Sequence, residues 1–208
     1  MAPRVVVIGA GVGGLVSALL LACRGLEVTL VDAAPGPGGK MRHIVLGDAR
    51  IDAGPTVFTM RWVFEQILAD AGTSLDEVLR LKPLQVLARH AWRSGDQRLD
   101  LLADVQHSAD EIGRFAGPED ARRYLAFCAE ARALYEHLET PALRSPRPTL
   151  AGMIRELGPA GFKTLAALGP FATMWARLGK HFHDPRLRQL FGRYATYCGG
   201  SPWQAPAA

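Results

Sequence analysis

The chain begins with apolar and polar segments in the order of a strand–helix–strand unit. Residues 5–8 form a continuous apolar run typical of a buried strand, and a glycine-rich turn at residues 9–14 follows directly. Residues 15–23 are mainly apolar over the length of a helix, and residues 27–31 predict a second strand. This order is typical of two parallel strands joined by a crossover helix.

The glycines of the turn have the spacing of a dinucleotide-binding fingerprint. Gly9 permits the tight turn, Gly11 lets the backbone approach a pyrophosphate, and Gly14 lets the helix pack closely against the strand. The N-terminus of the following helix presents unpaired N–H groups and the positive end of its dipole to the phosphates. Asp32 ends the second strand, where its carboxylate can accept hydrogen bonds from a ribose.

The following residues predict one hairpin and two helices. Strands at 42–46 and 50–52 flank a Gly47-Asp48 turn, which is a good hairpin signal. Helices are expected at about 60–70 and from Ser74 through Leu79.

The rest of the chain predicts a second hairpin and then mainly helices. Residues 84–92 and 97–102 flank a polar turn, and Ser108 with Glu111 has the spacing of a capping box that would begin a short helix. A longer helix is expected at about 119–138, and Asp184-Pro185 is a favourable helix start.

Composition limits the classes of function. The chain has 208 residues, is 49% hydrophobic and 21% charged, and has a net charge of +4 and a pI of about 9.2. Because charges of both signs are scattered, nucleic-acid binding is not expected, whereas a basic face that meets anionic lipid is compatible with the pattern. His181-x-His183-Asp184 is interpreted as a polar lead-in to a helix, so no metal site is predicted.

The cysteines and the apolar segments bear on localisation. Cys23, Cys128 and Cys198 have neither metal nor redox spacing, which indicates a reducing compartment. We expect no signal peptide and no spanning helix, since the apolar N-terminal run is interrupted by glycines. The expected location is the cytoplasm, with peripheral association to the inner membrane.

A second glycine pair distinguishes between cofactors. Gly38-Gly39 follows the ribose-binding acid closely, and Lys40 or Arg42 can neutralise pyrophosphate charge. A nicotinamide enzyme has no special use for this pair, whereas an extended FAD site does. The segment 52–57 would then return the chain beneath the flavin.

Together these motifs resemble the bacterial phytoene-desaturase type of carotenoid desaturase, within the FAD-dependent amine-oxidase-like group. The later segments 58–64, 86–90, 181–187 and 190–197 resemble the purple-bacterial branch called methoxyneurosporene dehydrogenase or 1-hydroxycarotenoid 3,4-desaturase. The resemblance covers essentially the whole chain. Family members run to about five hundred residues and end with another glycine-rich FAD segment, so an N-terminal fragment is expected.

The resemblance implies a cofactor and a reaction. FAD would accept a hydride while a C–C double bond forms in a 1-hydroxy or 1-methoxy acyclic carotenoid. No catalytic acid or base is implied, and the missing C-terminal part would be needed to complete the FAD site. The residues assigned to the cofactor are Gly9, Gly11, Gly13, Gly14, Asp32, Gly39, Lys40, Arg42, Gly54, Pro55 and Thr56.

The predicted fold class is α/β, with an FAD-binding Rossmann-like unit at residues 1–82 and part of a mainly helical or mixed substrate and membrane-associating domain at 83–208. Three alternatives stay open: a bacterial-type phytoene desaturase, a non-catalytic truncated nucleotide-binding fragment, and a soluble nicotinamide dehydrogenase.

Overall fold

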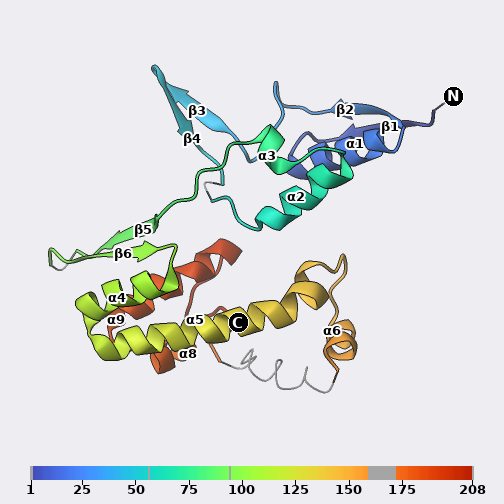
Figure 1. Cartoon of the computed structure of the whole chain (residues 1–208). Coiled ribbons are helices and arrows are strands. Elements are labelled where there is room, and N and C mark those ends of the chain that lie inside the picture. Colours follow the sequence, from blue (N-terminus) through green and yellow to red (C-terminus); the bar gives the residue numbers. More distant parts are fainter. Residues whose placement is uncertain (1, 56, 94, 159–171, 208) are drawn as a thin grey trace. The chain divides into compact units, whose positions relative to one another are not determined.

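The computed structural model describes residues 2–55, 57–93, 95–158 and 172–207. They form two compact units, Met1–Lys82 and Pro83–Ala208 (Figure 1). The roles of cofactor domain and substrate domain remain predictions for these two units. Thr56, one of the residues assigned to the cofactor, lies outside the described residues.

The first unit contains the predicted strand–helix–strand motif. Its two strands pair in parallel, from Arg4 opposite Glu27 to Ile8 opposite Val31. The elements of this motif are β1 (Arg4–Ile8), α1 (Val12–Cys23) and β2 (Glu27–Val31). The helix begins at Val12 and so includes Gly13 and Gly14 in its first turn, three residues earlier than the apolar run alone indicates.

A hairpin and two helices complete this unit. The predicted hairpin is confirmed as an antiparallel pair with Ile44 opposite Ile51. Ser74 caps the last helix through a capping box with Glu77, as its position predicts. The elements are β3 (His43–Leu46), β4 (Ala49–Asp52), α2 (Arg61–Asp70) and α3 (Leu75–Val78).

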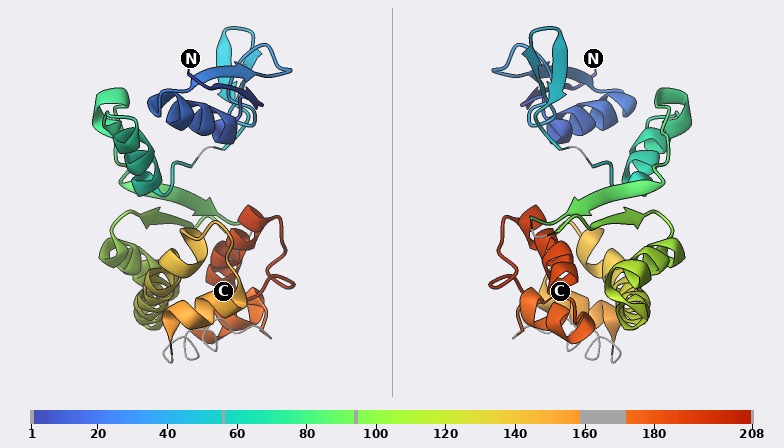
Figure 2. Two further views of the ribbon diagram at one scale, coloured as in Figure 1. Left: turned by 90° about the vertical axis from the view of Figure 1, so that its right-hand side faces the viewer. Right: turned by 90° about the vertical axis from the view of Figure 1, so that its left-hand side faces the viewer.

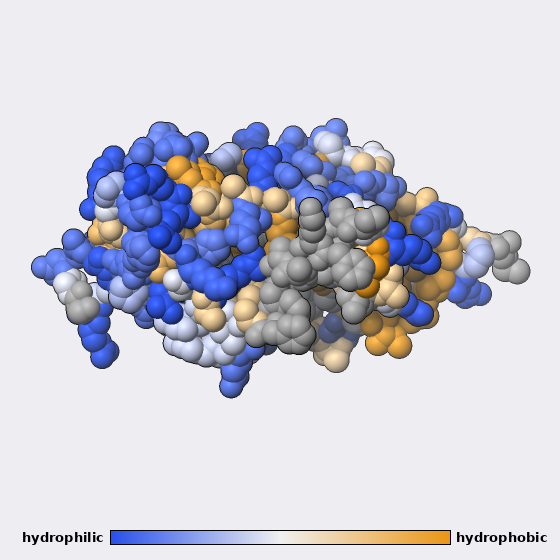
Figure 3. Space-filling view, turned by 90° about the horizontal axis from the view of Figure 1, so that it is seen from below, coloured by the Kyte–Doolittle hydropathy of each residue, from blue (hydrophilic) through white to orange (hydrophobic). Residues whose placement is uncertain are grey.

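The β1–β2 pair is covered on one side only within the described residues. α1 contacts both strands, yet Val6 is 63% exposed and Ile8 is 85% exposed. Figure 3 shows hydrophobic side chains at the surface of this unit. Parallel sheets are normally buried on both faces, so these side chains form an apolar surface rather than a core.

The second unit consists of a hairpin and a group of helices. Its hairpin, β5 (Val86–Ala91) with β6 (Arg98–Leu102), is antiparallel. Figure 2 shows the hairpin at one end of the helices. The helical elements are α4 (Val105–Ala116), α5 (Pro118–Leu138), η1 (Glu139–Leu143), α6 (Leu150–Leu157), α8 (Met174–His181), α9 (Pro185–Gly192) and η2 (Arg193–Cys198).

The main hydrophobic core lies in the second unit. Phe182 is 1% exposed and stacks on Phe191 with 4.8 Å between ring centroids. Phe127 packs against both rings from α5. The core residues are Leu99, Leu101, Ala109, Ile112, Tyr124, Leu178, Phe182, Leu187, Leu190 and Phe191. Helices α4, α5, α8 and α9 and strand β6 are therefore held together by one apolar cluster.

The predicted capping role of Ser108 is wrong. Asp104 caps α4 instead, by accepting a hydrogen bond from the backbone N–H of His107 at 2.8 Å. Ser108 is fully buried one turn into the helix, where its hydroxyl contacts the backbone N and O of Leu102. Because Asp104 already caps the helix, Ser108 is not needed at its N-terminus. Its hydroxyl instead joins α4 to β6.

None of the helices in the described part of the chain is long and apolar enough to cross a bilayer.

Candidate cofactor site

The glycine-rich turn is built so that strand and helix nearly touch. A Cβ on Gly14 would lie 1.7 Å from the carbonyl oxygen of Gly9. Gly9 itself has a φ of +100°, which L side chains rarely adopt. Its N–H donates to the carbonyl of Val31 on β2 at 2.7 Å, which fixes the turn at the end of the sheet.

The N-terminus of α1 is suited to an anion. The N-cap residue is Gly11, which supplies no side-chain cap, and the first turn contains no acidic residue. Backbone N–H groups at such a helix start have no intrahelical acceptor, and the helix dipole adds positive potential there. The turn can therefore donate hydrogen bonds to phosphate oxygens without displacing a protein group.

Asp32 lies directly after β2 and contacts the turn. Its Oδ2 accepts a hydrogen bond from the N–H of Ala10 at 2.5 Å, and its Oδ1 accepts one from Ala34 at 2.7 Å. These bonds, first that from Ala34 and then that from Ala10, lower the pKa of the carboxyl. Asp32 is thus an ionised, oriented acceptor beside the turn, as a ribose-binding acid must be.

The second glycine pair is joined to the first turn. Gly38 forms a parallel bridge with Gly11, and its N–H donates to the carbonyl of Ala10 at 2.8 Å. A Cβ on Gly39 would lie 3.0 Å from the Cα of Gly11. Residues separated by a helix and a strand therefore share one backbone surface, and larger side chains would not fit between them.

The segment 52–55 continues this surface. A Cβ on Gly54 would lie 2.0 Å from the carbonyl oxygen of Lys40, and the N–H of Ala53 donates to the carbonyl of Arg42 at 2.9 Å. The side chains of Lys40 and Arg42 are exposed, and no carboxylate is paired with either in the described part of the chain. Two uncompensated cations therefore lie beside a glycine-lined surface.

Nine of the eleven residues assigned from sequence are brought into this connected surface. The other two are Pro55, which is exposed and follows Gly54, and Thr56, which lies outside the described residues. Reasoning from sequence missed Gly38 as the bridging residue and the backbone of Ala10 and Ala34 as the partners of Asp32. Gly38 has a φ of +125°, a conformation that favours glycine. The glycine pair in the sequence was therefore the signal that could have identified Gly38 as a residue of this site.

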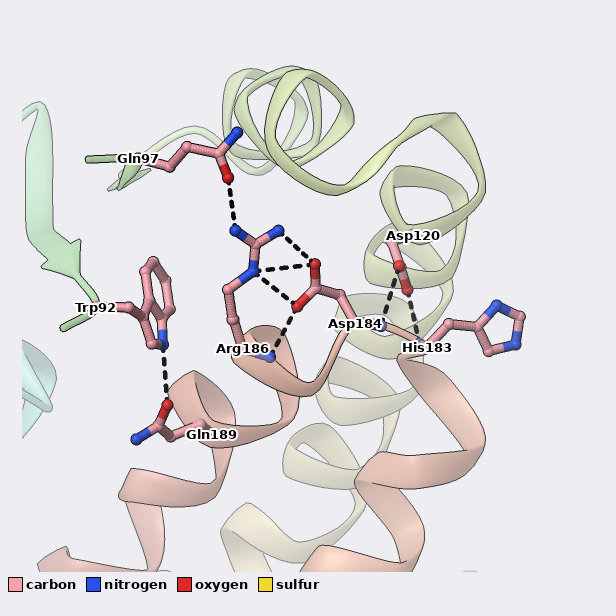
Figure 4. Close-up of polar contacts among 7 residues, drawn as sticks. All are labelled: Trp92, Gln97, Asp120, His183, Asp184, Arg186 and Gln189. Carbon is pink, nitrogen blue, oxygen red and sulfur yellow. Dashed lines mark hydrogen bonds and ion pairs between the residues drawn. The ribbon is translucent and has the colours of Figure 1, made fainter. Parts of the chain in front are cut away.

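The second unit has its own polar contacts, shown in Figure 4. Asp184 caps α9 and forms a multidentate ion pair with Arg186, which lowers the pKa of the carboxyl. Arg186 donates on to Gln97 at 2.6 Å, and the indole of Trp92 donates to Gln189 at 2.9 Å. Both bonds connect the β5–β6 hairpin to α9.

The comparison with protein families finds a match to the NAD(P)-binding Rossmann-like domain over residues 7–70. Among solved structures, an oxidoreductase from Methanosarcina mazei matches with a TM-score of 0.51 and 14% identity, over 98% of this chain and 40% of that one. At this identity the likeness concerns the fold alone. The predicted fold class, a Rossmann-like α/β unit with part of a mainly helical domain, is confirmed.

Curated relatives match nearly the whole chain. It is 62% identical to hydroxyneurosporene desaturase of Rubrivivax gelatinosus over 204 residues, which are 98% of this chain and 39% of that protein. The hydroxyneurosporene desaturase of Cereibacter sphaeroides is 45% identical, over 98% of this chain and 41% of its own length. The phytoene desaturase of Cercospora nicotianae is 32% identical, over 98% of this chain and 32% of its own length.

The chain thus spans about two fifths of the length of the hydroxyneurosporene desaturases that it matches. The resemblance identified from the motifs is confirmed, since the glycine turn, the second glycine pair and the later segments all lie within the matched region. The chain is therefore similar along nearly its whole length to the first part of carotenoid desaturases, and it is more similar to these hydroxyneurosporene desaturases than to the phytoene desaturase of Cercospora nicotianae.

Proposed function

We propose that the chain carries the cofactor-binding part of an FAD-dependent desaturase that introduces the 3,4 double bond into a 1-hydroxy or 1-methoxy acyclic carotenoid. The observation that carries the proposal is the bridge between Gly11 and Gly38. The bridge places the glycine-rich turn and the Gly38-Gly39 pair on one backbone surface. A turn that binds only a pyrophosphate does not need this additional pair. The names of the matched relatives support the substrate class.

The residues present fit an extended dinucleotide. The helix start at Gly11 would hold the pyrophosphate, and Asp32 would accept hydrogen bonds from the adenosine ribose. Lys40 and Arg42 would neutralise phosphate charge, while Gly54 leaves the backbone open beside them. FAD, when bound, supplies the hydride acceptor that removal of hydrogen from an unactivated C–C bond requires.

The substrate implies a location. An acyclic carotenoid dissolves in lipid, so the enzyme must collect it from a membrane. With a net charge of +4, peripheral association with the anionic cytoplasmic face of the inner membrane is the location that we propose. Such binding needs only an amphipathic or basic surface and no spanning helix.

A chimaera tests the cofactor and the reaction together. The matched segment of the Rubrivivax gelatinosus desaturase would be replaced by this chain, and the purified product would be assayed for bound FAD by its visible absorbance. We expect stoichiometric flavin in the chimaera and its loss in Asp32→Ala, with Asp48→Ala as a control for an aspartate in an exposed turn. A colourless chimaera would contradict the cofactor assignment.

The same chimaera distinguishes the two carotenoid branches. Membranes that contain it would be supplied with a hydroxylated acyclic carotenoid or with phytoene. We expect conversion of the hydroxylated substrate. Conversion of phytoene alone would favour the phytoene desaturase alternative.

A further inference from the structure

A groove in the second unit has not been assigned a role. It lies between α8, α9 and the residues after η2, and its volume is about 470 Å³. Small-molecule sites commonly occupy roughly 300–1,000 Å³, so the groove is large enough for several carbons of a ligand. Its walls include Trp175, Pro202 and Trp203.

The apolar part of the groove is aromatic. The rings of Trp175 and Trp203 lie 4.8 Å apart between centroids, and Trp203 is 60% exposed. Gly192 forms part of the lining, and a Cβ there would meet Pro202 at 3.4 Å and Trp175 at 3.6 Å. Glycine at this position therefore leaves room beside Trp175 and Pro202 that a side chain would partly fill.

On the polar side of the groove, one hydrogen bond fixes the orientation of the side-chain amide of Gln189. The indole Nε1 of Trp92 lies 2.9 Å from the side-chain amide of Gln189, as Figure 4 shows. An indole N–H only donates, so the atom facing it must be the amide oxygen. The amide NH₂ of Gln189 is therefore directed away from Trp92, and it remains a donor for a group in the groove that Gln189 lines.

The other polar side chains that line the groove are also donors. Arg193 lines it and has no acceptor atom in its side chain. The carbonyl of Pro202 already accepts a hydrogen bond from the backbone N–H of Trp175 at 2.9 Å. A ligand matched to this groove is thus an apolar chain that offers a hydrogen-bond acceptor.

We propose that the groove binds the oxygen-bearing end of an acyclic isoprenoid chain, and that Gln189 is a specificity-determining residue that donates to its oxygen. The inference rests on the proposed function and deepens it. Both a hydroxyl and a methoxyl oxygen accept a hydrogen bond, whereas a hydrocarbon end does not. A groove with donors at one side and indoles at the other would therefore accept either oxygenated end and disfavour the plain hydrocarbon.

The experiment compares three small probes on the intact chain: tetrahydromyrcenol, its methyl ether and the hydrocarbon of the same skeleton. Binding is followed by shifts of the indole N–H resonances of the protein in ¹H–¹⁵N spectra. For the unaltered chain we expect the alcohol and the ether to bind about equally, and the hydrocarbon roughly threefold to tenfold more weakly. The resonances of Trp175 and Trp203 should move most.

Gln189→Glu is the decisive variant. A carboxylate still accepts from Trp92, so the contact between hairpin and helix is kept, but the donor to the ligand is lost. We expect the three probes to bind within about twofold of one another in this variant. Gln97→Glu is the matched control, because Gln97 accepts from Arg186 in the same hairpin–helix contact and does not line the groove.

Trp203→Ala separates the apolar contact from recognition of the oxygen. It should weaken all three probes alike and leave their ratio unchanged. Equal binding of the hydrocarbon and the ether to the unaltered chain would overturn the inference, as would a preference that survives Gln189→Glu. Since these probes need no flavin, such a result would leave the cofactor proposal standing.

Discussion

The carboxylate of Asp120 accepts a hydrogen bond from the backbone N–H of His183, with 3.0 Å between Oδ1 and N (Figure 4). Its other oxygen lies 3.3 Å from the N–H of Asp184. Asp120 is only 4% exposed, and it belongs to the first turn of α5, far from His183 in sequence. One side chain thus satisfies the backbone where α8 ends and α9 begins.

Asp120→Ala should destabilise the chain, because two backbone N–H groups at the start of α9 would lose their acceptor. An unsatisfied buried donor costs about 1–3 kcal/mol, and we expect a loss of that size in the free energy of unfolding by urea. Asp110→Ala, at an exposed position on α4, is the control. An unchanged midpoint for Asp120→Ala would show that water replaces the carboxylate.

Gly14→Ala should disrupt the cofactor turn. The added methyl group would lie 1.7 Å from the carbonyl oxygen of Gly9, so β1 and α1 must separate. Overpacking of this kind typically costs about 1–3 kcal/mol, and flavin uptake by the chimaera should be lost with it. Gly36→Ala, where no heavy atom lies within 4 Å of the new Cβ, should retain both stability and flavin.

His90→Phe should reduce the sensitivity of the fold to mild acid. Burial, and then the positive charge of Arg193, lower the pKa of His90 below its usual 6.5. Below pH 6.5 the unfolded chain therefore binds a proton that the folded chain does not, and stability falls as the pH decreases through this range. Burial lowers the pKa of His181 as well, so the variant should remove only part of the effect.

Thermal unfolding of His90→Phe and the unaltered chain, followed from pH 7.5 down to pH 5.5, measures the difference. The midpoint of the unaltered chain should fall more steeply with decreasing pH than that of the variant. Parallel curves would show that His90 is protonated equally in the folded and unfolded chain.

Met60→Asn should stabilise the first unit. Met60 has a φ of +53° at the N-cap of α2, in the left-handed region. That conformation costs roughly 1–2 kcal/mol for an ordinary residue, whereas asparagine tolerates it. We expect a gain of about 1 kcal/mol in unfolding free energy, with the exposed Met41→Asn as the control for loss of an apolar side chain.

The local elements could be predicted from the sequence because their signals are local. The apolar run before Gly9 and the strand that ends at Val31 depend on periodicity and on turn residues. Pro118 begins α5 in the way that proline favours at the first helical position. The start of α1 within the glycine turn was harder to predict, since glycine disfavours helices by propensity.

The contacts that join distant segments could not be predicted. The partners of Asp120 lie between α8 and α9, more than sixty residues away in sequence, and nothing in the residues around Asp120 distinguishes it from an ordinary acid in a first helical turn. Ser108 was misread for the same reason, because its true partner, Leu102, belongs to β6. At the cofactor site the glycine pairs were predictable by type, but the bridge between them depends on tertiary folding.

The bridge between Gly11 and Gly38 couples the local unfolding of the glycine-rich turn to that of the segment before β3. Since Gly38 binds the backbone at Ala10 and Gly11, the turn cannot loosen without releasing the chain that leads into β3. A ligand that tightens the turn must then slow amide hydrogen exchange in the β3–β4 hairpin, although it need not touch it. Ligand binding at the glycine-rich turn could then be detected by the exchange rates of amides that make no contact with the phosphates.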